Sequence, residues 1–187
     1  QDEERQRRAV EHPGTADAVK AIMSRDPLLW ARRPEHDGFM ELRLGLGEQR
    51  SRLTINVNPS RSSIPELVHE LEQVTSQFTT VDRVPVVASF DTCGSVGISG
   101  PTDAMLAVAR GVVLQLVGLH APSEVVVCGL ASVRTAGRWE WLKWMPHTSS
   151  DHSPLAGPHL ASTPPGCSNL VAELSDIVAA REAVAEG

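Results

Sequence analysis

The segment Ser95–His120 constrains the fold of this chain more than any other stretch. A short apolar run, Val96–Ser99, stops at Gly100-Pro101, and a longer, almost wholly apolar run of helix-forming residues follows. Two apolar runs separated by a Gly-Pro turn signal indicate a buried strand, a tight turn and a buried helix. This order of elements is the outline of a phosphate-binding loop.

A working loop of this kind has the pattern G-x-x-x-x-G-K-[ST]. Backbone N–H groups surround the phosphates, the lysine reaches them and the hydroxyl binds Mg²⁺. With Gly100 at the first glycine, Met105, Leu106 and Ala107 hold the second glycine, the lysine and the hydroxyl positions. We predict that the scaffold survives without catalysis, although any buried unit of strand and helix would look the same. The candidate loop residues are Gly100, Pro101, Thr102, Asp103, Met105, Leu106 and Ala107.

Composition excludes several classes of protein. The formal net charge of -6 argues against broad nucleic-acid binding, which needs a concentrated basic face. The longest apolar run, Ala104–Leu119, contains Arg110 and Gln115 and is shorter than the roughly 20 residues of a bilayer span. We therefore predict a core helix and no membrane span. The charged N-terminal run has no apolar segment behind it, so no signal peptide is expected.

Cysteines and histidines do not suggest a metal centre. The three cysteines are far apart, which is typical of reduced thiols in a cytosolic protein, and the C-terminal histidines match no common metal-site spacing. We expect no metal. The residues concerned are Cys93, Cys128 and Cys167, and His147, His152 and His159.

Residues 1–27 predict a stalk or linker helix, with Thr15 as an N-cap, although a solvated surface helix fits the charge equally well. Trp30 follows in a segment bounded by two prolines and is expected to dock on the domain body. Arg32 and Arg33 beside it are either an anion-binding pair or surface charges, and we favour surface charges.

Alternation of apolar and polar residues over Phe39–Leu46 and Leu53–Val57 predicts two half-buried strands, which we expect to pair as an antiparallel hairpin. Ser63, Pro65 and Glu66 then have the pattern of a capping box and begin a helix. The apolar face of this helix is expected to consist of Leu67, Leu71, Val74 and Phe78.

Further short strands are predicted at Val84–Ala88, Gly94–Ser99 and Val125–Val127. The last two flank the central apolar helix, so we expect a parallel crossover of strand, helix and strand. An amphipathic helix from Ser168 onward is expected to lie on the sheet. The predicted fold class is α/β: a mostly parallel, P-loop NTPase-like sheet flanked by helices, with an N-terminal helical stalk end and a β-hairpin.

Three of the four tryptophans lie close together in the sequence. Clustered tryptophans are typical of a core edge or a contact surface. The candidate interface or structural residues are Trp30, Trp139, Trp141, Trp144 and His147.

Several motifs occur together in one order: LWARRP, LRLGLG, VGISGP opening an apolar helix that ends LVGLHAPSE, and WEWLKWMPH. In this order they resemble the membrane-proximal part of EccC-type FtsK/SpoIIIE ATPases of actinobacterial type VII secretion systems. The resemblance spans roughly residues 28–147. It implies the end of a stalk at 1–27 and a degenerate, RecA/FtsK-like ATPase domain at 28–187.

The resemblance also implies a setting. Family members carry N-terminal transmembrane helices and further ATPase modules, which use ATP and Mg²⁺, whereas no cofactor is expected in this segment. Implied partners are those modules, the ubiquitin-like cytosolic domain of EccD and other membrane subunits, in a hexameric system at the cytoplasmic face of the plasma membrane that exports small helical WXG100 substrates. The chain starts on Gln1 and stops at Gly187, before a strand that the family has, so we expect a piece of a longer protein.

Three functions remain open at this point. The first is a non-hydrolysing, ATPase-like module that couples a membrane channel to a downstream motor. The second is a nucleotide-binding and weakly active ATPase domain, which would use the start of the helix after Pro101 with Arg32 or Arg33 as charge partner. The third is a DNA-handling domain, which the acidic balance disfavours.

Overall fold

The computed structural model describes residues 1–55, 65–149 and 151–185, and it has a mixed α/β fold, as predicted. Short 3-10 helices occupy Ala136–Arg138 (η1), Glu140–Trp144 (η2) and Pro146–Thr148 (η3). The strands are β1 Glu41–Arg50, β2 Thr80–Ser89, β3 Gly129–Leu130 and β4 Leu160–Ala161. The α-helices are α1 Asp2–Glu11, α2 Thr15–Ser24, α3 Pro65–Ser76, α4 Phe90–Cys93, α5 Thr102–Leu119 and α6 Pro164–Ala185.

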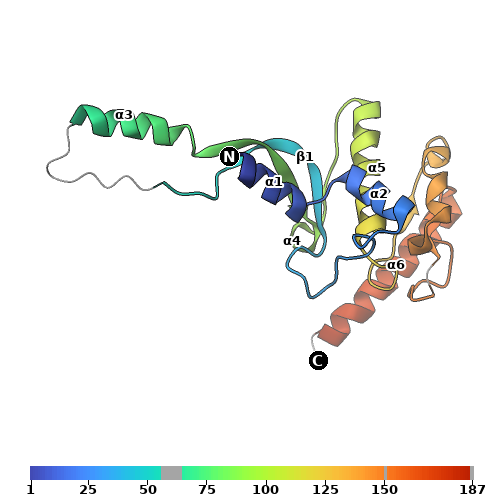
Figure 1. Ribbon diagram of the computed structural model, residues 1–187. Helices are drawn as coiled ribbons and strands as arrows, with labels where there is room; N and C mark the ends of the chain where they lie inside the picture. The colour runs from blue at the N-terminus through green and yellow to red at the C-terminus, as the bar shows by residue number, and fades with distance from the viewer. Residues whose placement is uncertain (56–64, 150, 186–187) are drawn as a thin grey trace.

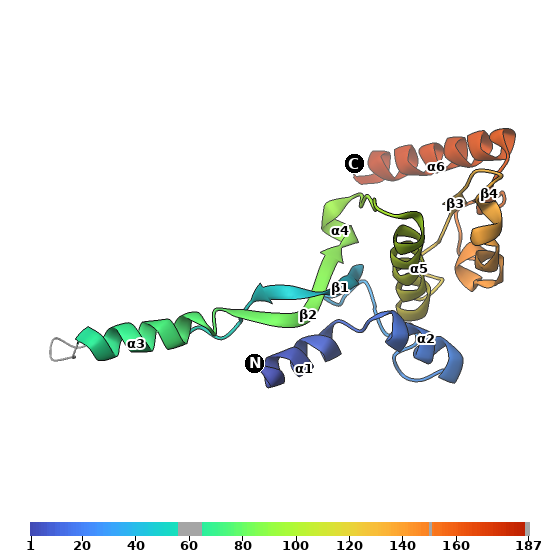
Figure 2. The ribbon, with the colours of Figure 1, turned by 90° about the horizontal axis from the view of Figure 1, so that it is seen from above.

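A body and an arm make up the molecule (Figure 1). The body contains α2, α5, α6 and the short elements near residues 129–161, while the β1–β2 ribbon runs away from it with α1 alongside. At the far end of the ribbon lies α3, and we use "the arm" for α3 with its connecting segments 51–55 and 77–79. Figure 2, seen from above, shows the same separation of α3 from the body.

The strand β1 pairs antiparallel with β2, in a register that joins Glu41 to Ser89 and Arg50 to Thr80. The prediction that 39–46 pairs with 53–57 is therefore wrong for the described residues, because residues 51–55 are not a strand and residue 57 lies outside the description. Residues 80–89, which include the predicted strand 84–88, form a longer ladder with β1, and the Ser51 N–H continues it by donating to the Thr79 carbonyl at 2.8 Å. The arm is thus inserted between the two strands of one ribbon.

The helix α3 begins at Pro65 and ends at Ser76, close to the predicted limits. Its expected cap, Ser63, lies outside the described residues. The predicted apolar face is present, but its side chains are exposed to solvent rather than covered by the body. A helix with an apolar stripe normally buries that stripe against another element, and α3 does not do so within the described residues.

The core lies where α2, α5 and β1 meet. Small residues allow α2 to approach α5 closely: Ala18 and Ala21 are fully buried, and a Cβ at Gly118 would lie 3.1 Å from the Ala18 Cβ. Gln115, also buried, accepts from the Arg43 N–H and donates to the Arg43 carbonyl, both at 2.9 Å. The side-chain amide thus hydrogen-bonds to the backbone of β1 at the point where the pairing of β1 with β2 is irregular. It explains a polar residue inside an otherwise apolar helix.

We expect Gly118→Val to lower the free energy of unfolding by about 1–3 kcal/mol, because added carbons in a close contact force neighbouring backbone apart. Urea denaturation of both chains measures the difference. Gly137→Val is the matched control, since a Cβ there meets nothing within 4 Å. Equal losses in the two variants would show that α2 and α5 have room to separate.

The predicted mostly parallel sheet is not present in the described residues. The parallel pairing there is confined to β3 with β4, two residues each. Residues 95–99 form no strand, and the run 125–128 instead passes beside η3, where the Val127 N–H donates to the His147 carbonyl at 2.9 Å. The two predicted strands therefore do not pair with each other through a crossover.

The helix α5 matches the predicted core helix. It is the one helix among residues 1–55, 65–149 and 151–185 that is long and apolar enough to cross a bilayer by length and composition. Its second half is buried or half-buried, while most of its first turns are exposed. The last helix, α6, begins at Pro164, four residues before the predicted start. Both α1 and α2 pack on later elements, and the predicted boundary at residues 27 and 28 stays a prediction.

Candidate functional site

The candidate loop joins α4 to α5 on the surface of the body. Gly94 and Gly100 have positive φ values of 64° and 147°, which glycine adopts without strain. Pro101 occupies the N-cap of α5 and provides no side-chain cap. The loop therefore keeps the glycine-dependent entry to a long helix, while the buried strand predicted before it is replaced by an exposed segment without strand pairing.

The chemistry at the start of α5 is poor for a phosphate. Met105 and Leu106 are half-buried and Ala107 is exposed, so these three positions present no cation and no hydroxyl. The acidic residue in the first turn is Asp103. A carboxylate there interacts with the positive end of the helix dipole in place of a ligand, and its negative charge repels an anion. Thr102 is the one hydroxyl of this turn and is exposed.

Arg32 and Arg33 lie at the opposite end of α5 from the loop. The Arg32 N–H donates to the Leu119 carbonyl at 2.9 Å, and an 18-residue helix is about 27 Å long. The Arg32 guanidinium donates to the carbonyls of Gly38 and Glu11, and Arg33 pairs with Glu124 at 2.7 Å. The structure does not bring these arginines to the loop. Nucleotide binding at the loop stays a prediction, without them as its charge partners.

The tryptophans do not form one cluster. Trp30 docks on the body, as predicted, because its Nε1 donates to the Val117 carbonyl at 3.1 Å. Trp139 and Trp141 are half-buried, with ring centroids 6.4 Å apart. Trp144 is 75% exposed, with the Lys143 ammonium 5.4 Å from its ring centroid. Trp144 is therefore a surface residue, and Trp139 and Trp141 are at the core edge.

Two fully buried histidines connect the segment 30–40 with the end of α5 and with η3. His120 accepts from the Met40 N–H at 3.2 Å through Nε2 and donates to the Leu116 carbonyl at 3.1 Å through Nδ1. His147 donates from Nε2 to the His120 carbonyl at 2.8 Å, and its buried Nδ1 has no partner. Each histidine is therefore held in its neutral form, and His147 is structural.

Burial lowers the pKa of both histidines. For His120, the nearby positive charge of Arg32 lowers the pKa further, while the bond to Leu116 and the Glu124 carboxylate act in the other direction. For His147, the bond to His120 opposes the effect of burial. His159 donates to or accepts from the Ser153 hydroxyl at 2.7 Å. No group of three or more potential metal ligands occurs in the described part of the chain.

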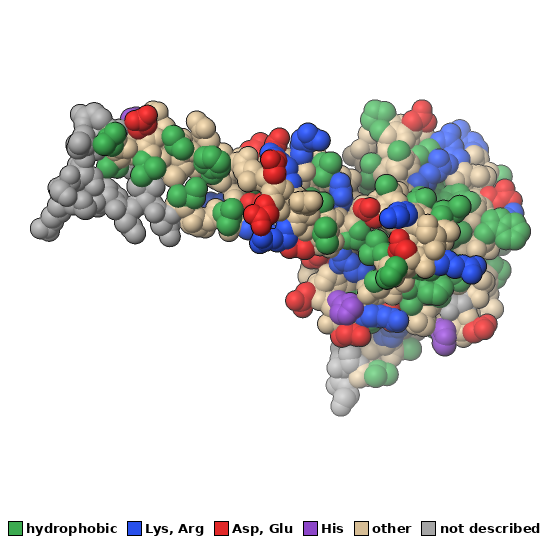
Figure 3. All heavy atoms as spheres, viewed as in Figure 1, with side chains coloured by type: hydrophobic (Ala, Val, Ile, Leu, Met, Phe, Trp, Pro, Cys, Tyr) green, Lys and Arg blue, Asp and Glu red, His purple; other side chains and the backbone are tan. Residues whose placement is uncertain are grey.

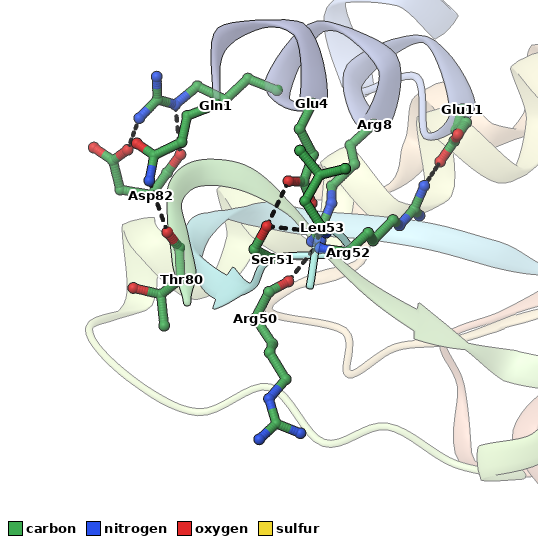
Figure 4. A network of polar contacts seen from close by, with 11 residues as sticks. Gln1, Glu4, Arg8, Glu11, Arg50, Ser51, Arg52, Leu53, Thr80 and Asp82 are labelled. Atoms are coloured by element: carbon green, nitrogen blue, oxygen red, sulfur yellow. Dashed lines mark hydrogen bonds and ion pairs between the residues drawn. The ribbon is translucent and has the colours of Figure 1, made fainter. Parts of the chain in front are cut away.

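A buried polar network fixes α1 to the base of the arm (Figure 4). Glu4 pairs with Arg8 at 2.5 Å, and both side chains are over nine-tenths buried. Glu4 also accepts from the Ser51 hydroxyl at 2.9 Å and from the Arg52 N–H at 2.8 Å, while Arg8 donates to the Arg50 carbonyl at 2.6 Å. The pair thus satisfies backbone groups where β1 ends.

Further contacts extend this network, which we call the α1 clamp. Arg5 pairs with Asp82 of β2, Gln1 donates to the Thr80 carbonyl at 3.1 Å, and Arg52 pairs with Glu11 at 2.5 Å. Burial alone would raise the pKa of Glu4, but the hydrogen bonds from Arg52, Ser51 and Arg8 outweigh it and lower the pKa. Both strands of the ribbon are therefore held by one helix.

The sequence did not identify the α1 clamp as a functional feature. Its available signal is the spacing of Glu4 and Arg8, four residues apart in a helix. Glu3 and Arg7 have the same spacing, yet both are exposed and lie 3.4 Å apart. Spacing therefore finds candidate pairs, and burial decides between them.

Comparison with known proteins supplies a relationship. No protein family model matches the chain. The ESX-4 secretion system protein EccC4 of Mycobacterium tuberculosis is 29% identical over 157 residues, which is 82% of this chain and 12% of that protein. The ESX secretion system protein EccC of Thermomonospora curvata is 28% identical over 76% of this chain. That of Geobacillus thermodenitrificans is 24% identical over 67%.

The aligned segments cover only 9% to 12% of the length of these three relatives. The similarity therefore concerns one part of much longer proteins. It extends over most of the present chain and confirms the resemblance that the sequence motifs indicated: the chain is similar to a segment of the EccC proteins of ESX secretion systems.

Proposed function

We propose that this chain is a non-hydrolysing, ATPase-like module of an EccC-type component of a type VII secretion system. It would couple the membrane channel to the ATPase motor that drives protein export. The observation that supports this most strongly is the start of α5, where Met105, Leu106 and Ala107 replace the groups that bind phosphate and Mg²⁺ and Asp103 adds a negative charge. The EccC relatives support the setting.

The α1 clamp supports the coupling role. A helix that holds both strands of a ribbon through buried and exposed ion pairs transmits its own displacement to that ribbon as a unit. In the proposed setting, α1 continues a stalk that leads from the membrane at the cytoplasmic face. The partners would be the ATPase modules of the same chain and the cytosolic domain of EccD, in a hexameric assembly.

Calorimetry with Mg-ATP tests the proposal against its main alternative, a nucleotide-binding and weakly active ATPase domain. We expect no heat of binding at micromolar chain and up to millimolar nucleotide. Micromolar binding that disappears in the double variant Pro101→Ala/Thr102→Ala would establish the alternative. A gel shift with duplex DNA at low salt addresses the DNA-handling function in the same preparation, and no shift is expected.

Leu106→Lys should not restore ATP hydrolysis, because Met105 still crowds the loop and Ala107 still offers no hydroxyl to Mg²⁺. Phosphate release from this variant is expected to equal that of the parent chain and of the uncharged control Leu106→Gln. ATP hydrolysis by the lysine variant, and not by the parent or the glutamine control, would mean that the loop lacks one residue only for hydrolysis. It would refute the non-hydrolysing assignment.

A further inference from the structure

Two apolar surfaces of the chain are exposed at opposite ends of the molecule. The first, the arm stripe, consists of Leu67, Leu71, Val74 and Phe78, and the second, the Trp surface, consists of Leu130, Val133 and Trp144. Figures 1 and 2 both place α3 at one end and the segment around residues 130–144 at the other. Each set lies within one short segment of the chain and is exposed, as apolar residues at interaction sites are.

The arm stripe has the spacing of a helix that docks on a partner. Leu67, Leu71, Val74 and Phe78 follow one another at intervals of four, three and four residues, so they project from one side of α3 and its end. Their exposed fractions lie between 42% and 58%. The twelve residues of α3 include three glutamates and no lysine or arginine. The arm therefore offers an apolar stripe on an acidic helix.

The Trp surface has the opposite charge. Its apolar residues occur in a segment with Arg134, Arg138 and Lys143 and one acidic residue, Glu140. Lys143 and Glu140 pair with each other at 2.5 Å, so the positive charge of the segment comes from the two arginines. Lys143 lies beside the Trp144 ring, and Arg110 of α5 donates to the Arg138 carbonyl at 3.2 Å, which adds a further cation. In Figure 3, apolar and basic side chains gather over this end of the body, whereas α3 shows mainly apolar side chains with acidic ones.

These surfaces cannot meet within one chain. The α1 clamp holds the ribbon where it meets the arm: Glu4 binds the segment at the end of β1, and Arg5 binds Asp82 of β2. Paired strands of ten residues resist bending back, and the arm projects away from the body in both views. Contact between the two surfaces therefore requires a second copy of the chain.

We propose that the arm stripe of one copy docks on the Trp surface of a second copy. The contact buries apolar side chains from both partners, and the acidic helix faces the basic segment, so charge fixes the orientation. Because the two surfaces differ, the contact is heterologous: the pair as a whole keeps one free arm and one free Trp surface, so further copies can add. This contact does not depend on whether the loop binds ATP.

Sedimentation velocity of the full 187-residue chain from 1 to 100 µM tests the contact. We expect the mass to rise with concentration, and the association to weaken as NaCl is raised from 50 to 500 mM, because charges contribute. Leu71→Asp and Trp144→Glu change one surface each, at exposed positions that should leave the melting temperature close to that of the parent. Each variant alone is expected to associate at least about tenfold more weakly.

Mixing the two variants gives the decisive result. Leu71→Asp keeps the Trp surface and Trp144→Glu keeps the arm, so an equimolar mixture should form a one-to-one dimer that grows no further. Val10→Glu, at a 79% exposed position on α1, is the control and should associate like the parent chain. No association of the parent at 100 µM, or no dimer in the mixture, would overturn the proposal while leaving the calorimetric test of function unaffected.

Discussion

Replacing Glu4 by glutamine is expected to lower the free energy of unfolding by about 3 kcal/mol. The change leaves the Arg8 guanidinium buried without its counter-charge, and removing one member of a buried ion pair is far more costly than the pair is stabilising. The Arg50 carbonyl still accepts from Arg8, which places the loss at the low end of such substitutions. Urea denaturation followed by circular dichroism measures it.

Glu3→Gln is the matched control, because Glu3 and Arg7 have the same spacing in the same helix and are exposed. An exposed pair contributes at most a few tenths of a kcal/mol. A loss for Glu3→Gln as large as that for Glu4→Gln would show that α1 is stabilised by helix charge rather than by its contact with the ribbon. The double variant Glu4→Met/Arg8→Met should recover part of the loss, since it leaves no buried charge.

Acid is expected to destabilise the chain steeply below about pH 6.5, the ordinary pKa of histidine. His120 and His147 have lowered pKa values in the folded chain, so the unfolded chain binds protons first as pH falls. Stability is therefore complete above pH 6.5 and is lost as pH falls toward the folded-state pKa values, by at most about 1.4 kcal/mol per pH unit for each histidine. Burial shifts His12 and His159 in the same direction.

Thermal unfolding between pH 7.5 and 5.0 measures this slope. His147→Gln should reduce it by the contribution of one proton, because the amide can still donate to the His120 carbonyl but does not titrate. An identical slope in the parent and in His147→Gln would mean that His147 does not remain neutral in the folded chain. The loss of the Glu4 contribution belongs to a more acidic range, because its pKa is lowered from an already acidic value.

Local signals predicted individual helices well. Pro65 and Thr102 mark the beginnings of α3 and α5 in the structure, and both follow from turn and capping residues next to apolar runs. The partner of a strand was not predictable in the same way. Residues 53–57 alternate and residues 84–88 are continuously apolar, and neither pattern states which segment forms the ladder with β1.

The burial of individual side chains could not be predicted from the sequence either. Val125–Val127 reads as a strand covered on both faces, yet the segment pairs with η3 at one N–H and is only half-buried. Trp144 has a large apolar side chain of the kind usually found in a core, yet it lies on the surface. The candidate loop was located correctly as the entry to α5, whereas its separation from Arg32 by the length of that helix required coordinates.

The length of the β1–β2 ribbon has a mechanical consequence. Ten residues of strand extend about 33 Å, and α3 lies beyond them. The α1 clamp holds the arm end of this ribbon, through Arg52 and Asp82, and the ribbon joins the body at its other end. By this strand geometry, a tilt of about 10° at the junction with the body displaces the tip by roughly 6 Å. A small rotation of the ribbon at its junction with the body thus becomes a step as large as a helical turn at the arm.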